Sequence, residues 1–422
     1  MIPEIIVSAL FLAGYALITL EHKLNLQKYI TASALGGLLW VIISLFGFEH
    51  VEEAIFEMGG EIFGLIIFLF VAMVLIEILV HYRFFDIIRA KLLALKLSDY
   101  GQLWVIAVIS FFLSAVIDNL TTTIVMIQIS RRFFRNSNLL IAGATIVVAA
   151  NAGGAFSPIG DVTTIMLWLA GKFSAVEILT KGFLPALGLF LVSTFLLAKK
   201  IKSDSLDIVE ESIELSASDK LIIAGVLSSF ATPLIFSQIG LEPYLGLLMS
   251  LGVVGMLIAF FRVVHPGDTH LTADIDKMLP KVDFSSLLFF SGILLAVGAL
   301  RFLGILDILS QQLFGESPSL NTFVLGNTAL GLFSAIVDNI PLTAAAISIL
   351  NTNDSSIWVL LALTVGTGGS ILAIGSAAGV VAMGMLKDLS FFQYIKIASL
   401  PAATGYFVCV AIWYLQNYLV ST

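Results

Sequence analysis

The sequence has little charge and almost no cysteine. Only 12% of its 422 residues are charged, against about 25% in soluble domains. The 21 basic and 29 acidic residues leave a formal net charge of −8 and form no basic patch for nucleic acid. The one cysteine, Cys409, excludes an internal disulfide and is expected to be a buried, inert thiol. The composition therefore excludes an ordinary soluble domain.

Apolar residues dominate instead. They make up 59% of the chain, and the mean hydropathy is +1.04. Runs such as IIVSALFLAGYALITL and IFGLIIFLFVAMVLIEILV are long enough to cross a hydrocarbon core of about 30 Å. The first run starts with Glu4 and has no basic segment before it, so we expect a retained helix and not a cleaved signal peptide. The sequence predicts an all-α polytopic membrane protein whose partner is the lipid bilayer, with no nucleic-acid or soluble partner.

The chain repeats itself. SAVIDNLTTT at 114–123 matches SAIVDNIPLT at 334–343. GGAFSPIG from Gly153 matches GGSILAIG from Gly368, so each half has the Asp-Asn segment first and the glycine-rich segment after it. Landmarks in the same order and at similar spacing indicate a gene duplication. The predicted parts are a first repeat 1–198, a cytoplasmic linker 199–219 and a second repeat 220–422.

The arginines Arg131, Arg132 and Arg135 decide the expected topology. If the N-terminus is outside and 102–130 crosses the membrane once, these arginines lie outside, against the positive-inside rule. A re-entrant hairpin keeps them inside. Each half then has five crossings and one hairpin, and this odd number inverts the second repeat and leaves both termini outside. The expected hairpins are 102–130 and 320–351, and the expected broken helices are 139–170 and 357–387.

Three acidic residues fall within these irregular segments. Asp118 and Asp338 lie at the hairpin tips, and Asp161 follows the first glycine-rich break. A charge at mid-bilayer costs on the order of 3 kcal/mol, so an intramembrane carboxylate indicates a functional site. The alternative is that each Asp only caps a helix N-terminus. The glycine pairs have a similar alternative, as residues that permit close helix packing.

Neutral oxygen atoms surround these acids, as hard cations require. Desolvation makes a carboxylate bind a proton more readily, so H⁺ and a cation are expected to compete for the same acids. Glu77, one helical turn before His81, either relays protons or extends to the interface. The supporting residues are Ser114, Thr121, Thr122, Ser157, Thr343, Ser370, Ser376 and Glu77.

The motifs DNLTTT, NAGGAFSPIGDVTTIMLW and DNIPLTA resemble those of the NhaD family of Na⁺/H⁺ antiporters, in the superfamily that also holds arsenite and dicarboxylate carriers. The resemblance implies a homodimer with a scaffold part and a mobile part, which exports Na⁺ or Li⁺ in exchange for H⁺ across a bacterial inner membrane. It implies no cofactor beyond the transported ions, with Na⁺ bound by the three acids. The implied cation- and proton-binding residues are Asp118, Asn119, Asn151, Asp161, Thr163, Thr164, Ser334, Asp338 and Asn339.

The second break departs from the first. It has Ala377 and Ala378 in the region where the first break offers Thr163 and Thr164. This difference leaves the number of cation sites open.

Other functions fit the sequence less well. An anion carrier of the same superfamily is expected to have neutral residues at the hairpin tips. An intramembrane aspartyl protease needs G-x-G-D, but Pro158 occupies the position of the first glycine. A receptor or structural protein does not need paired broken helices. We therefore expect a transporter and not an enzyme.

Overall fold

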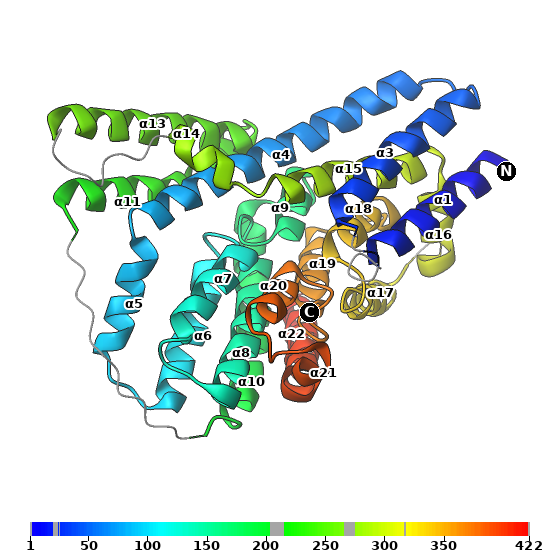
Figure 1. Ribbon diagram of the computed structural model, residues 1–422. Helices are drawn as coiled ribbons and strands as arrows, with labels where there is room; N and C mark the ends of the chain where they lie inside the picture. The colour runs from blue at the N-terminus through cyan, green and yellow to red at the C-terminus, as the bar shows by residue number, and fades with distance from the viewer. Residues whose placement is uncertain are drawn as a thin grey trace. The chain divides into compact units, whose positions relative to one another are not determined.

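The computed structural model describes residues 2–19, 24, 26–202, 215–265, 275–315 and 318–420, and the regular structure in these ranges is entirely helical. Eight helices in the described ranges are long and apolar enough to cross a membrane. The expected class, an all-α polytopic membrane protein, is confirmed (Figure 1). Most of the expected linker, 203–214, and the terminal residues 1 and 421–422 lie outside the described residues.

The chain forms two compact units, and each takes elements from both halves of the sequence. Unit 1 consists of Met1–Tyr82, Ser216–Ser317 and Thr343–Asn351. Unit 2 consists of Arg83–Leu215, Pro318–Leu342 and Thr352–Thr422. Helix α18 (Asn339–Ile349) begins in unit 2 and continues in unit 1.

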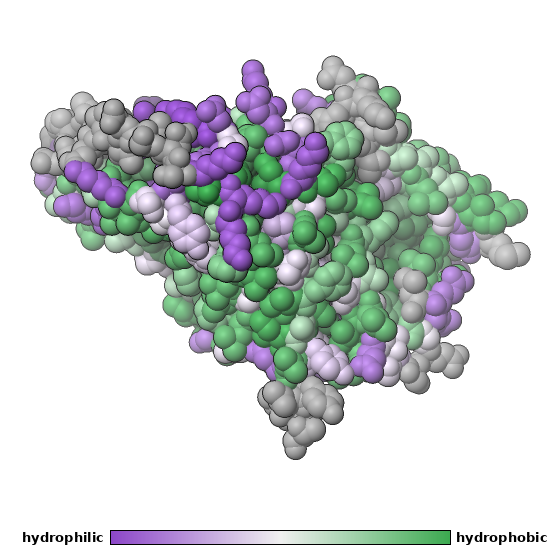
Figure 2. Space-filling view, turned by 90° about the horizontal axis from the view of Figure 1, so that it is seen from below, coloured by the Kyte–Doolittle hydropathy of each residue, from purple (hydrophilic) through white to green (hydrophobic). Residues whose placement is uncertain are grey.

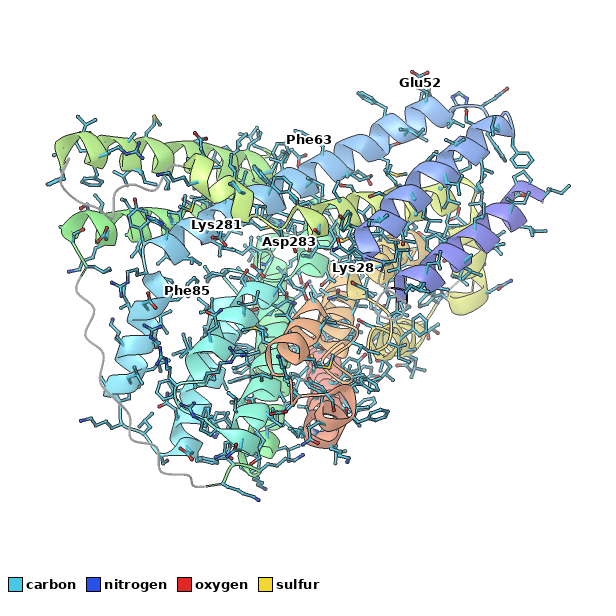
Figure 3. The ribbon with its side chains drawn as sticks, in the orientation of Figure 1. Lys28, Glu52, Phe63, Phe85, Lys281 and Asp283 are labelled. Atoms are coloured by element: carbon cyan, nitrogen blue, oxygen red, sulfur yellow. The ribbon has the colours of Figure 1, made fainter. Side chains whose placement is uncertain are left out.

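Unit 1 is built from long helices that pack mainly through α3, α4, α13 and α15. Phe63 on α4 makes an edge contact with Tyr244 on α13, with ring centroids 5.9 Å apart. The Lys28 ammonium at the start of α3 lies 4.4 Å from the Phe289 ring centroid on α15, whose N-terminus is capped by Asp283 (Figure 3). Its helices are α1 (Ile2–Thr19), α3 (Lys28–Leu45), α4 (Val51–His81), α11 (Ala217–Ser229), α12 (Thr232–Gln238), α13 (Pro243–Val264), α14 (Ile275–Met278), α15 (Phe284–Phe302) and α16 (Ile305–Phe314).

Unit 2 contains the segments with the sequence landmarks. Its helices are α5 (Phe84–Ala94), α6 (Asp99–Ser114), α7 (Asn119–Ser130), α8 (Asn136–Ala155), α9 (Val162–Leu169), α10 (Ala175–Ala198), α17 (Leu320–Phe333), α19 (Ser355–Gly368), α20 (Ala377–Met385), α21 (Phe391–Tyr394) and α22 (Leu400–Val420).

Helices α8 and α19 form the core of unit 2. Every residue of α8 from 141 to 155 is buried, and so is every residue of α19 from 356 to 368. The two helices contact each other; α6, α7 and α10 also contact α8, while α9, α10, α17 and α22 contact α19 (Figure 1). Both buried helices stop abruptly, α8 at Ala155 and α19 at Gly368. The core therefore ends in irregular backbone that other helices of the same unit cover.

The outward-facing side chains are largely apolar, as a lipid-facing surface requires. Large hydrophobic side chains are exposed on α13, among them Met256, Phe260 and Val263. Figure 2 shows apolar side chains over much of the visible face, with hydrophilic ones gathered in limited regions. Exposed apolar residues on this scale would be a liability in water but suit a helix that faces lipid.

Two glycines allow helices of unit 2 to approach at backbone distance. A Cβ added at Gly153 would overlap the carbonyl oxygen of Phe111, and one added at Gly368 would overlap the carbonyl oxygen of Gly331. These partners, like the glycines, occupy matching places in the two halves of the sequence. The close-packing interpretation of the glycine pairs therefore holds at both positions.

We expect Gly153→Ala and Gly368→Ala each to lower the apparent melting temperature of the protein in detergent. Alanine improves helix propensity by about 1 kcal/mol, but overpacking against a backbone atom costs about 1–3 kcal/mol because the backbone itself must move. Thermal unfolding with a thiol- or tryptophan-based readout measures the difference.

The matched control is Gly384→Ala on α20, where an added Cβ meets no atom within 4 Å. It should leave the melting temperature unchanged or raise it slightly. Equal melting temperatures for all three variants would contradict the close-packing interpretation.

Candidate functional site

Two pairs of irregular segments converge in unit 2. The first tip, 115–118, joins α6 to α7, and the second tip, 334–338, joins α17 to α18. The first break, 156–161, separates α8 from α9, and the second break, 369–376, separates α19 from α20. These four segments carry the three candidate aspartates, Asp118, Asp161 and Asp338, together with four of the selected serines.

Each break packs on the tip of its own half through matching contacts. Ser114 Oγ donates to the carbonyl oxygen of Ala150 at 2.6 Å, and Ser334 Oγ donates to that of Val365 at 2.9 Å. A Cβ at Gly160 would overlap the Ser114 carbonyl oxygen. The corresponding glycine of the second break, Gly375, stands in the same relation to the Ser334 carbonyl oxygen. The duplicated sequence landmarks thus make duplicated contacts.

All three candidate aspartates cap helices. Asp118 Oδ1 accepts from the Thr121 amide at 2.7 Å, Asp161 Oδ1 from the Thr163 amide at 3.2 Å, and Asp338 Oδ1 from the Ile340 amide at 3.1 Å. At the second break a serine does the same work, because Ser376 Oγ accepts from the Gly379 amide at 3.1 Å. Serine and aspartate are about equally good N-caps. Capping alone therefore does not explain a carboxylate at the first break.

The second carboxylate oxygen of Asp161 is the unusual atom of this region. Asp161 is 2% exposed, and Oδ2 has no hydrogen-bond partner among the described residues. The hydroxyl of Thr163, also buried, lacks one as well. A buried oxygen without a partner is costly, so a ligand for it is expected.

Asn151 on α8 links the start of α7 to the second break. Its Oδ1 accepts from Asn119 Nδ2 at 3.0 Å, and its Nδ2 donates to Ser370 Oγ at 2.8 Å and to Ser376 Oγ at 3.0 Å. The amide therefore uses its oxygen and both of its hydrogens in contacts within the protein. The cluster brings together selected residues from both halves of the sequence.

The remaining selected residues play smaller parts. Ser157 donates to the Ala115 carbonyl oxygen, and Thr164 donates to the Ala155 carbonyl oxygen at 3.5 Å. Glu77 lies on α4 and belongs to the other compact unit. The side chains of Thr122, Asn339 and Thr343 are buried, and that of Thr121 is half-buried.

Two residues that matter to the geometry escaped the sequence analysis. Tyr394 donates from its hydroxyl to the Ser370 carbonyl oxygen at 2.7 Å, but no motif marks its place in an apolar run. Gly366 faces Asp161: an added Cβ would lie 3.1 Å from Asp161 Oδ2. The signal for Gly366 was available, because it aligns with Asn151 when the two glycine pairs are superimposed.

The acids do not form one ready-made metal cage. No three His, Cys, Asp or Glu side chains among the described residues lie close enough to hold one metal ion. A cation at Asp161 would instead be held by one carboxylate and by neutral oxygens. Such a mixed set suits a weakly bound, exchangeable monovalent cation better than a resident divalent one.

Comparison with known proteins also indicates an ion transporter. The family described as citrate transporters matches residues 15–366. Sodium/proton antiporter 1 of Arabidopsis thaliana is 34% identical over 97% of this chain and 72% of its own length. The Na⁺/H⁺ antiporters NhaD of Alkalimonas amylolytica and Vibrio cholerae are 33% and 31% identical, over 96% and 97% of this chain and 89% and 91% of their own lengths. With this coverage and identity, the chain belongs to the citrate-transporter family and, within it, to the NhaD-type Na⁺/H⁺ antiporters.

Proposed function

We propose that this protein exchanges Na⁺ or Li⁺ for H⁺ across a membrane by alternating access, with H⁺ and the cation competing for the carboxylates of Asp118, Asp161 and Asp338. One observation carries the proposal: Asp161 Oδ2 is buried and has no hydrogen-bond partner among the described residues. Either a proton or a cation satisfies that oxygen, so loading one requires the release of the other.

The charge of the site favours a cation over an anion. Asp118, Asp161 and Asp338 all belong to unit 2, and Asp161 forms no ion pair with any described residue. An anion such as arsenite or a dicarboxylate would be repelled by an ionised Asp161, which has no basic partner among the described residues. The capping amides of α7 and α9 are already bonded to the Asp118 and Asp161 carboxylates. The anion-carrier alternative therefore finds no support here.

The proposal includes an inverted repeat, which contacts at the two ends of α10 support. At its C-terminal end, Lys202 N donates to Asn138 Oδ1 at 3.1 Å, near the start of α8. Asn138 Nδ2 lies 3.4 Å from Asp99 Oδ2 at the start of α6. Lys200 Nζ donates to the Ile397 carbonyl oxygen at 2.6 Å, before the start of α22. Thus α6 and α8 begin where α10 ends.

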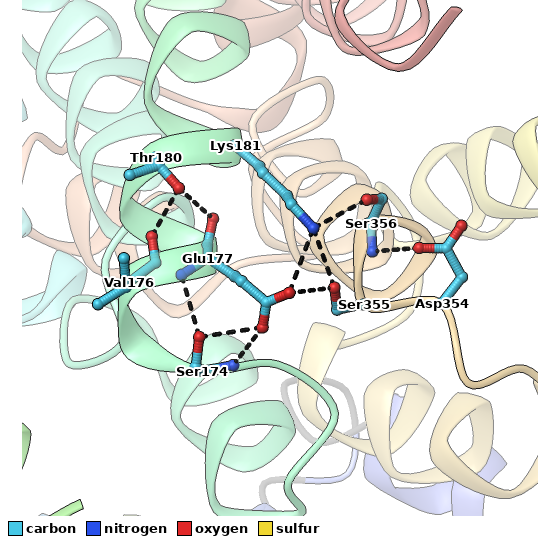
Figure 4. Close-up of polar contacts among 8 residues, drawn as sticks. All are labelled: Ser174, Val176, Glu177, Thr180, Lys181, Asp354, Ser355 and Ser356. Carbon is cyan, nitrogen blue, oxygen red and sulfur yellow. Dashed lines mark hydrogen bonds and ion pairs between the residues drawn. The ribbon is translucent and has the colours of Figure 1, made fainter. Parts of the chain in front are cut away.

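The opposite end of α10 meets the second half of the chain. Lys181 Nζ lies 3.2 Å from Glu177 Oε1 and donates to Ser355 Oγ at 3.0 Å and to Ser356 Oγ at 3.1 Å (Figure 4). These serines begin α19, so α19 starts where α10 starts. Tyr414, near the end of α22, donates to Asn321 Oδ1 at the start of α17. Helices α17 and α19 therefore run opposite to α6 and α8, as an inverted repeat requires.

Membrane thickness agrees with this arrangement. Helix α10 has 24 residues, or about 36 Å at 1.5 Å per residue, which is enough to cross the bilayer. Its C-terminus is followed by Lys199, Lys200 and Lys202, which place that end inside. The first tip is then approached from inside and the second from outside. We therefore expect the tips and breaks near the middle of the membrane, where irregular backbone in transporters lines the substrate site.

The same proposal covers the larger organisation. Unit 2, with tips and breaks, is the mobile transport part, and unit 1 is the scaffold through which two copies form a homodimer. The division of the chain into two compact units supports this assignment. We place the protein in a bacterial inner membrane with both termini outside. Glu77 of unit 1 tunes proton access without binding the cation.

Cysteine labelling tests the topology. In Asn136→Cys and Asn353→Cys, both exposed positions, a membrane-impermeant thiol reagent added outside should modify position 353 and miss position 136. The arginine-rich end of α7 faces inside, whereas the segment before α19 faces outside. The native Cys409 is buried and serves as the unlabelled background. Labelling of both positions from one side would rule out the inverted repeat.

Neutralising the acids tests the chemistry. Asp118→Asn and Asp338→Asn remove a charge while keeping shape and a capping oxygen, and Asp161→Ser installs the cap that Ser376 provides at the second break. Each variant should fold and insert, yet abolish or severely reduce Na⁺-driven proton release in everted vesicles with a pH-sensitive dye. Near-normal exchange by a variant would show that the substituted aspartate only caps its helix and does not bind the cation.

The pH dependence of transport tests whether H⁺ and Na⁺ share a site. Lowering the pH protonates the acids, so the apparent KM for Na⁺ should rise while the maximal rate stays nearly constant at saturating Na⁺. The same competitive pattern should persist in Glu77→Gln. A constant KM with a collapsing maximal rate would instead indicate proton control at a separate site.

A further inference from the structure

The two breaks differ at one pair of equivalent positions, which the alignment of the two halves identifies. When the halves are aligned on Gly153 and Gly368, Asn151 corresponds to Gly366, Ala155 to Ser370, and Asp161 to Ser376. Contacts follow the same correspondence. The Asn151 amide bonds to Ser370 and Ser376, while a Cβ on Gly366 would point at Ala155 and Asp161. The same triangle of positions therefore occurs twice, once with an amide at its apex and once with a glycine.

In the first triangle the apex is filled by the protein. Asn151 Nδ2 supplies two N–H donors to two serine hydroxyls, and Ser376 Oγ accepts from the Gly379 amide as well. Ser370, Ser376 and Asn151 are each at most 2% exposed. All polar side-chain atoms of this triangle have partners, and none of its members carries a charge. Nothing in it calls for a cation.

In the second triangle the apex is a glycine, and Asp161 Oδ2 has no partner among the described residues, nor has the hydroxyl of Thr163 nearby. A Cβ at Gly366 would lie 3.1 Å from Asp161 Oδ2, 3.3 Å from Thr163 Oγ1 and 3.4 Å from the Ala155 Cβ. The first two atoms are the buried oxygens that have no hydrogen-bond partner among the described residues. A methyl group at that point is crowded, but hard cations bond to oxygen at about 2.3–2.6 Å. The space beside Gly366 thus suits a cation between the two oxygens and does not suit a side chain.

We infer that the chain binds one Na⁺ or Li⁺ at Asp161 Oδ2 and Thr163 Oγ1, in a pocket that Gly366 keeps open, and that the Asn151 amide closes the equivalent pocket of the other half. The inference rests on the proposed function. It adds that one cation binds per chain and that Gly366 determines how large a cation the pocket accepts. It also explains the departure at the second break. There Ser376 and Ala378 replace Asp161 and Thr163, because the pocket they would line is filled by Asn151.

Gly366→Ala tests the pocket in the full-length protein. The added methyl group narrows the space beside both oxygens, so the dissociation constant for Na⁺ should rise at least about tenfold, and that for the smaller Li⁺ should rise less. Radioactive Na⁺ binding to purified protein gives both the affinity and the number of ions per chain, which should be one in the wild type. Gly384→Ala, with open space around it, is the matched control.

Thr163→Val keeps the test decisive if Gly366→Ala fails to fold. Valine has the shape of threonine and removes a buried hydroxyl without a partner among the described residues, so the variant should melt at a higher temperature without Na⁺. Its Na⁺ affinity should nevertheless fall at least about tenfold. If Thr163 had only a structural role, Thr163→Val would change the melting temperature and leave the Na⁺ affinity unchanged.

The outcomes separate the two proposals. Wild-type protein that neither binds Na⁺ nor exchanges it for H⁺ would overturn the proposed function and the inference together. Wild-type exchange with unchanged Na⁺ affinity in Gly366→Ala or in Thr163→Val would overturn the inference alone. Two Na⁺ ions per wild-type chain would also overturn it, because a second pocket would then exist despite Asn151.

Discussion

The hydrogen bonds of the Asn151 side chain hold the centre of unit 2 together. One amide joins the α6–α7 tip, through Asn119, to two serines of the second break. These bonds lie among buried residues, where each lost partner would leave a buried polar group unsatisfied. The positions of α8, α19 and α20 therefore depend on this side chain. So does the asymmetry between the two breaks, because the equivalent residue of the second half is a glycine.

Capping and ion binding need not compete for the same atom. In each of the three aspartates Oδ1 caps the helix that follows. A carboxylate has a second oxygen, and at Asp161 that oxygen is buried beside Thr163 and Gly366. Capping fixes the direction of the side chain at little entropic cost, so the second oxygen is already oriented when a cation arrives. In the proposed site, capping by Oδ1 therefore orients Oδ2 for the cation and does not exclude cation binding.

The energetics of such a site suit a transporter. A buried carboxylate without a counterion is unstable as an anion, so it favours either a bound proton or a bound cation over the bare charge. In the proposed mechanism, these loaded states are the ones in which the site is exposed to one side or the other. Exchange of one ion for the other then follows from the electrostatics without a dedicated base.

The sequence by itself determined the class of protein, the duplication and the acids. Hydropathy, glycine pairs and intramembrane carboxylates are local signals, and a bilayer makes each one costly to misplace. Only the tertiary structure decided which partners each of the selected side chains contacts. The expectation that Asn151 binds the cation stays a prediction, and only the structure shows that its amide bonds to serines 219 and 225 residues away. The sequence analysis did not select Gly366, because glycine has no side chain that could bind an ion. Its meaning comes from the Asp161 oxygen that packing places 3.1 Å from its missing Cβ, and such long-range contacts depend on how helices distant in sequence pack together.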